Sequence, residues 1–123
     1  MSSSLTLLQR VSTLLQGNLK QILFKELHND NRVNLYDVGE YWVAFEKSAY
    51  QLELLSRKSA DTVMLHVSDS PFPVAMHCMH HSRVKAICRT HVMSRRGMEY
   101  LQLLGRPIDE GSYSRWHRAH VDN

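Results

Sequence analysis

The feature that most constrains the fold is one glycine, Gly39, set between two short apolar runs. Residues 34–46 around it hold four of the chain's ten aromatic side chains. Glycine adopts positive φ at little cost, as tight turns between strands often require. Residues alternate along a strand, so Tyr41 and Trp42 would point to opposite faces of a sheet. We therefore predict a β-hairpin, with strands over 33–36 and 41–45 and a turn over 37–39.

Helical periodicity precedes and follows this hairpin. Leucine, isoleucine and valine recur at helical spacing over residues 4–28, which predicts a long N-terminal helix. Ser3 or Ser4 would cap its start, and Gly17 would mark a bend or a break into two helices. The period changes again at Glu46, which predicts a second helix ending near residues 57–58.

The second half of the chain alternates between strand and helix patterns. Strands are predicted over 62–67, which is rich in β-branched residues, and over 74–79 after a proline-bearing loop. Residues 83–90 fit either a strand or a helix. A helix is predicted over 94–104, ended by Gly105 and Pro107. The tail over 108–123 has weak periodicity and is expected to be partly ordered at best.

These elements predict an α/β (α+β) fold in which one mixed β-sheet is flanked by helices. The 123 residues fit one domain, residues 1–123, with its sheet core over about 32–105. A hydrophobic content of 43% and a charged content of 22% are typical of a globular protein. No apolar run is long enough to span a membrane, and the N-terminus lacks a signal-peptide pattern. Cys78 and Cys88 are expected to be reduced and buried, as in a cytoplasmic protein.

Basic residues gather in one stretch of the sequence. The window from His81 to Met98 contains five basic side chains and no acidic one. Such a stretch attracts polyanions, although a solvated face has the same composition. The basic residues are Arg83, Lys85, Arg89, Arg95 and Arg96.

Histidines offer a second kind of site. His77, His80 and His81 lie close together in the sequence, with His66 and His91 nearby. A strand would split the first three between two faces, and no H-E-x-x-H or C-x-x-C spacing occurs. The cysteines lack a catalytic signature, and no phosphate-binding glycine loop is present. We therefore expect no enzymatic activity, no cofactor and no bound metal. A small metal-dependent hydrolase using the histidines remains an alternative.

The hairpin and the helix after it resemble the N-terminal, mismatch-recognition domain of the MutS mismatch-repair proteins. Residues 35–45 are similar to the family's strand, glycine turn and second strand, and residues 46–55 to its following helix. Residues 72–76 resemble a later proline-bearing segment. The likeness covers roughly residues 20–90. It implies a mixed sheet flanked by helices and a role in DNA binding.

Five consecutive residues can be placed on the family's turn. Gly39 and Glu40 match its glycine and acid, Tyr41 falls at the phenylalanine that wedges beside a mispaired base, and Trp42 falls at the next aromatic. Val43 stands where the family has a base-contacting glutamate. No Walker motif is present, so the resemblance implies a stand-alone DNA-binding module without ATPase activity.

The expected function is non-catalytic nucleic-acid binding. Tyr41 and Trp42 would stack or wedge against bases, and the five basic residues would contact phosphate. DNA is the expected partner, and membranes are not. The alternative is a protein-interaction domain, in which the wide apolar stripe of the N-terminal helix contacts a partner or a second copy to form a homodimer.

Overall fold

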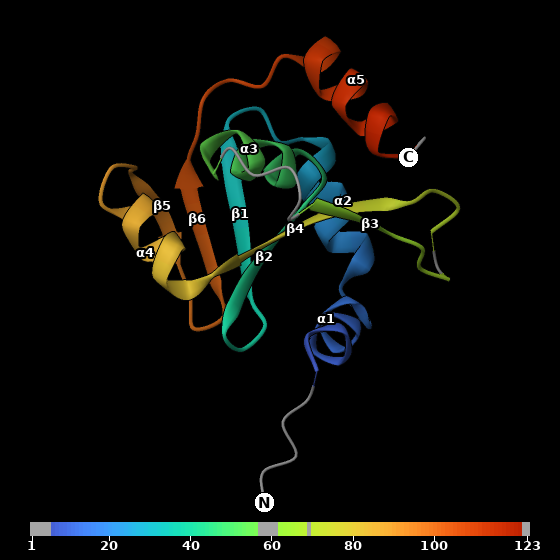
Figure 1. Ribbon diagram of the computed structural model, residues 1–123, viewed down its shortest axis with the longest axis horizontal. Helices are drawn as coiled ribbons and strands as arrows, with labels where there is room; N and C mark the ends of the chain where they lie inside the picture. Colours follow the sequence, from blue (N-terminus) through green and yellow to red (C-terminus); the bar gives the residue numbers. More distant parts are fainter. Residues whose placement is uncertain (1–5, 57–61, 69, 122–123) are drawn as a thin grey trace, which may run out of the picture.

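The computed structural model describes residues 6–56, 62–68 and 70–121, which form one sheet between layers of helices (Figure 1). The sheet has six strands in the order β3-β4-β2-β1-β6-β5. Its helices are α1 (Leu7–Leu15), α2 (Leu19–Leu27), α3 (Glu46–Ser56), α4 (His81–Cys88) and α5 (Glu110–Val121). Its strands are β1 (Arg32–Asp37), β2 (Tyr41–Phe45), β3 (Thr62–Leu65), β4 (Val74–His80), β5 (Met93–Arg96) and β6 (Tyr100–Leu104).

Two hydrophobic cores lie on opposite faces of the sheet. On one face, Val11 and Leu15 of α1 and Ile22 of α2 pack with Val43 and Phe45 of β2. On the other face, α3 and α4 cover the sheet, and the core there includes Ala44, Leu52, Val84 and Leu103. The expected class, a sheet flanked by helices, is confirmed. Every strand pairing in the described ranges is antiparallel, so the parallel pair that a mixed sheet would contain is not found there.

The predicted hairpin is confirmed. Gly39 has a φ of +105°, and its N–H donates to Asp37 Oδ1 at 2.9 Å. A Cβ at this position would lie 3.1 Å from Arg10 Nε, so the turn is pressed against α1. The alternation of β2 also holds, because Tyr41 packs against the α1 side of the sheet while Trp42 packs against the α4 side.

The prediction of one long helix over 4–28 was wrong in its continuity: the chain breaks into two helices at Gly17, the position expected to mark a bend or a break. Gly17 has a φ of +76°, and the Asn18 side chain donates to the Leu14 carbonyl at 2.8 Å, which ends α1. The first helix is capped by Thr6, in a reciprocal pair of hydrogen bonds with Gln9. The proposed caps Ser3 and Ser4 lie outside the described residues.

The prediction of a helix over 94–104 was also wrong, because this segment is a β-hairpin. Leu101 and Leu103 are buried while Tyr100 and Gln102 face the other side, which is the period of a strand. Met98 has helical spacing with Leu101 and Leu104 in the sequence, but it is 96% exposed in the turn of the hairpin. The ambiguous segment over 83–90 lies mostly in α4.

The tail over 108–123 was expected to be partly ordered at best, but most of it forms α5. This helix is held by polar contacts to α3, which hydrophobic periodicity does not reveal. Trp116 Nε1 donates to Glu53 Oε2 at 2.9 Å, and His117 Nε2 lies 3.0 Å from Glu46 Oε2. Lys47 Nζ contacts Glu110 Oε2 at 2.8 Å.

A buried carboxylate fills the gap where β1 and β2 separate. These strands pair only near their turn, and beyond it the Asn34 N–H of β1 donates to Ser48 Oγ of α3 at 2.8 Å. Glu26 of α2 is 1% exposed and accepts from the Ser48 N–H and hydroxyl and from the Asn34 and Asn29 amides, at 2.7–3.1 Å. Burial raises the pKa of Glu26, while these hydrogen bonds act to lower it.

Replacing Glu26 with alanine is therefore expected to destabilise the fold. Buried donors on Ser48 and Asn34 would lose their acceptor, at about 1–3 kcal/mol each. We expect the free energy of unfolding in urea to fall by about 3 kcal/mol. The control is Glu40→Ala in the exposed turn, where the change should stay within about 0.5 kcal/mol. Equal losses in the two variants would contradict this account.

Candidate nucleic-acid interface

A hollow of about 470 Å³ lies between α4 and the sheet. This volume falls within the range of small-molecule sites. Its position follows from the chain path, because β4 continues into α4 without a loop. His80 ends β4 and caps α4, its Nδ1 accepting from the Ser82 N–H at 3.2 Å. The hollow is lined by Trp42, His81, Ser82, Val84, Lys85, Cys88, Met93, Arg96 and Leu101.

Two stacked rings form one wall of the hollow. The Trp42 and His81 rings lie 5.1 Å apart between centroids at an interplanar angle of 26°. His81 Nε2 is 3.4 Å from Asp37 Oδ1 but makes no hydrogen bond among the residues described. The His81 backbone N–H donates to the Glu40 carbonyl at 3.1 Å. The hairpin turn and α4 thus hold a flat aromatic surface at the edge of the hollow.

Two cations come to the hollow from different elements. Lys85 lies one turn into α4, and Arg96 lies on β5 opposite Leu101, which places it on the α4 side of the sheet. Both side chains are exposed, and neither forms an ion pair within the described ranges. An apolar hollow with positive charge beside it suits a flat anionic ligand.

Cys88 contributes a thiol to the same hollow. Burial raises the pKa of Cys88, and the positive charge of Arg96 opposes part of that rise. At neutral pH the side chain is therefore a small apolar group rather than a nucleophile. Cys78 is half-buried and packs against the core on the α1 side.

The structure brings together three of the seven predicted site residues: Trp42, Lys85 and Arg96. Tyr41 lies on the opposite face of β2, half-buried, with its ring edge-on to His80 at 5.5 Å between centroids. Arg95 lies opposite Gln102 in the pairing of β5 with β6 and does not line the hollow.

Arg83 and Arg89 are both placed by α4, Arg83 within the helix and Arg89 at its C-terminal cap, and neither lines the hollow. Sequence reasoning missed the contribution of His81 and Met93. The signal for His81 was its place directly after His80, the strand partner of Tyr41, which only the register between β2 and β4 reveals.

His77, His80 and His81 lie in three different environments. His77 is fully buried, with Nδ1 2.7 Å from Thr62 Oγ1, whereas His80 caps α4 and His81 stacks on Trp42. The part of the chain that the structure describes holds no group of three or more His, Cys, Asp or Glu side chains placed to bind a metal ion. The alternative of a metal-dependent hydrolase therefore has no metal centre within this part.

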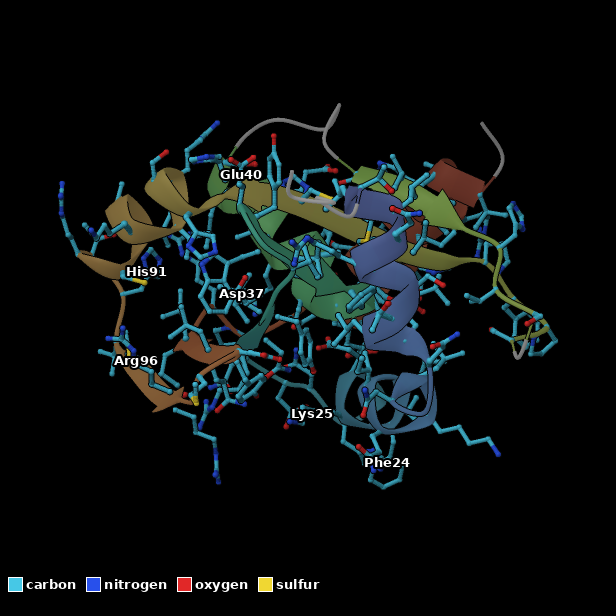
Figure 2. All side chains as sticks on the ribbon, turned by 90° about the horizontal axis from the view of Figure 1, so that it is seen from below. Phe24, Lys25, Asp37, Glu40, His91 and Arg96 are labelled. Carbon is cyan, nitrogen blue, oxygen red and sulfur yellow. The ribbon has the colours of Figure 1, made fainter. Side chains whose placement is uncertain are left out.

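Most of the apolar stripe of the N-terminal segment is buried inside the fold. Val11, Leu15, Leu19 and Ile22 are buried against the sheet, while Phe24 remains 66% exposed on α2 (Figure 2). The homodimer through this segment stays a prediction. Across the residues covered by the structure, no helix combines the length and apolar character needed to cross a bilayer.

Comparison with known proteins identifies no relative. No protein-family model matches this chain, and no curated protein or solved structure shows significant similarity to it. The resemblance of residues 35–45 to the MutS turn therefore stays a prediction.

The raised pKa of Cys88 predicts slow alkylation that accelerates only at high pH. The measurement is the rate of reaction with iodoacetamide in a Cys78→Ala variant, followed by mass spectrometry from pH 7 to pH 10. Because the thiolate is the reactive form, the midpoint of the rate profile should lie above 9, the ordinary value for this thiol. Circular dichroism confirms folding at each pH. A midpoint below 9 would contradict a pKa of Cys88 that is raised by burial.

Proposed function

We propose that this domain binds single-stranded nucleic acid and accommodates one base in the hollow beneath α4. The observation that carries the proposal is the Trp42–His81 wall with Lys85 and Arg96 at the same hollow. Stacking of a base on an aromatic ring contributes about 1–3 kcal/mol and tolerates any sequence. Lysine and arginine supply the contacts to phosphate.

The shape of the hollow favours an unpaired base. A base inside a duplex is stacked and paired, and entering a pocket would first require it to be flipped out. A single strand presents its bases without that cost. The likeness of the hairpin to the MutS turn favours DNA as the polymer, so single-stranded DNA is the proposed ligand.

Mismatch recognition is not part of the proposal. Val43, at the position of the family's base-contacting glutamate, is fully buried in the core beneath α1 and α2. Tyr41, at the position of the wedging phenylalanine, is on the face away from the hollow. The proposed activity is therefore binding without catalysis and without discrimination of mispaired bases.

Trp42 and Tyr41 offer a matched pair of variants on opposite faces of one strand. Trp42→Leu should weaken binding of an oligothymidylate of about ten nucleotides by tenfold or more, since one base stack is lost. Tyr41→Leu should leave affinity within about twofold of the wild type, because Tyr41 does not contact the hollow. Fluorescence anisotropy measures both, with thermal unfolding as a check on the fold. A larger loss for Tyr41→Leu than for Trp42→Leu would favour a binding surface centred on Tyr41 and would contradict binding in the hollow beneath α4.

A second pair separates a specific phosphate contact from the loss of net charge. Lys85→Gln removes a cation at the hollow, and Arg89→Gln removes an equal charge from the end of the same helix. We expect Lys85→Gln to lower affinity three- to tenfold and to reduce the slope of log K against log salt concentration by about 0.7, the value for one phosphate contact on a single strand. Arg89→Gln should change the slope little. Identical effects, or binding insensitive to salt, would count against the proposal.

A further inference from the structure

A second hollow lies on the other side of the β5–β6 hairpin. Its volume is about 530 Å³, and three of its lining residues are cations: Lys25 of α2 and Arg95 and Arg96 of β5. Among the residues that the structure describes, no carboxylate lines it. Lys25 belongs to α2 and Arg96 to β5, elements far apart in the sequence, and both are labelled in Figure 2. Like charges repel at such close quarters, and a bound anion would remove that repulsion.

The cations of this hollow have no acidic partner. Within the described ranges, Lys25, Arg95 and Arg96 form no ion pair. The Lys25 ammonium lies 4.4 Å from the centroid of the Tyr100 ring and 3.4 Å from its hydroxyl. This contact holds the lysine at the hollow rather than leaving it free in solvent.

The uncharged polar groups at the hollow are already engaged with one another. Gln102 Nε2 donates to Asn34 Oδ1 at 2.8 Å and to the Tyr100 hydroxyl at 3.0 Å, and Ser94 Oγ donates to Gln102 Oε1 at 2.8 Å. Tyr100 in turn donates to Asn34 Oδ1. Since these groups satisfy one another, the hollow offers an incoming ligand mainly positive charge, which suits a phosphate better than a base.

Arg96 connects the two hollows. It lies on the α4 side of the sheet but lines both of them, because β5 is the edge strand and the second hollow borders the same edge. Arg95 pairs across from Gln102 on the α2 side, and a register irregularity between Met93 and Arg95 accompanies the change of face. A ligand can therefore pass from one hollow to the other around a single strand, without crossing the sheet.

We infer that the bound strand continues around the β5 edge, with its phosphodiester backbone over Arg96 and then in the hollow of Lys25 and Arg95. This inference rests on the proposed function and extends it. The base-binding hollow takes one nucleotide, and the second hollow takes phosphates further along the same strand. Affinity should then depend on the length of the strand.

The test compares a double variant, Lys25→Gln with Arg95→Gln, on two probes. For an oligothymidylate of about ten nucleotides, we expect tenfold or greater loss of affinity and a salt slope reduced by about 1.4, the value for two phosphate contacts. For a thymidine dinucleotide, titrated by NMR, affinity should stay within twofold of the wild type. Both replaced side chains are exposed, so the double variant should fold, as circular dichroism can verify.

The matched control is Arg89→Gln with Arg106→Gln, which removes the same charge from two exposed positions outside both hollows. Equal losses in the two double variants would overturn the inference, as would equal losses on both probes. Wild-type binding that does not strengthen from the dinucleotide to the longer strand would also overturn it, while leaving the base-binding proposal in place. Absence of binding to either probe would overturn both.

Discussion

The fold depends on a single buried carboxylate, that of Glu26. Strands β1 and β2 separate beyond their turn, and the polar groups exposed there must find partners away from water. Glu26 accepts from the backbone and hydroxyl of Ser48 and from the Asn34 amide. It thereby ties α2 on one face of the sheet to the start of α3, where a negative charge also interacts favourably with the helix dipole. An acid at this point has a structural role.

Much of the fold was predictable, because the hairpin and the early helices are amphipathic. Gly39 marked its turn correctly, and the period of two in residues 41–45 assigned each side chain to its face. The errors arose where hydrophobic spacing was ambiguous or irrelevant. Leu101 and Leu104 have the spacing of a helix, whereas the strand buries Leu101 and Leu103. Helix α5 is held by Trp116 and by charged groups rather than by an apolar stripe.

The candidate site was less predictable than the fold. The basic window and the aromatic pair were visible in the sequence, but their distribution between faces depends on strand register. Arg95 and Arg96 are neighbours in sequence, but only Arg96 lines the hollow beneath α4, since successive residues of a strand point in opposite directions. Lys25 lies 70 residues before Arg95 in the sequence, and only the contact of α2 with Tyr100 of β6 brings it close. Long-range pairing of this kind leaves no local pattern.

The direct passage of β4 into α4 has a further consequence. Helix α4, which covers the hollow, is covalently continuous with a strand that pairs on both sides, to β2 and β3. Lifting α4 would therefore disturb β4, which is paired on both sides, so we expect the separation between α4 and Trp42 to change little when a ligand binds. Thickness, rather than hydrogen-bonding pattern, would then be the property by which this protein selects what it holds.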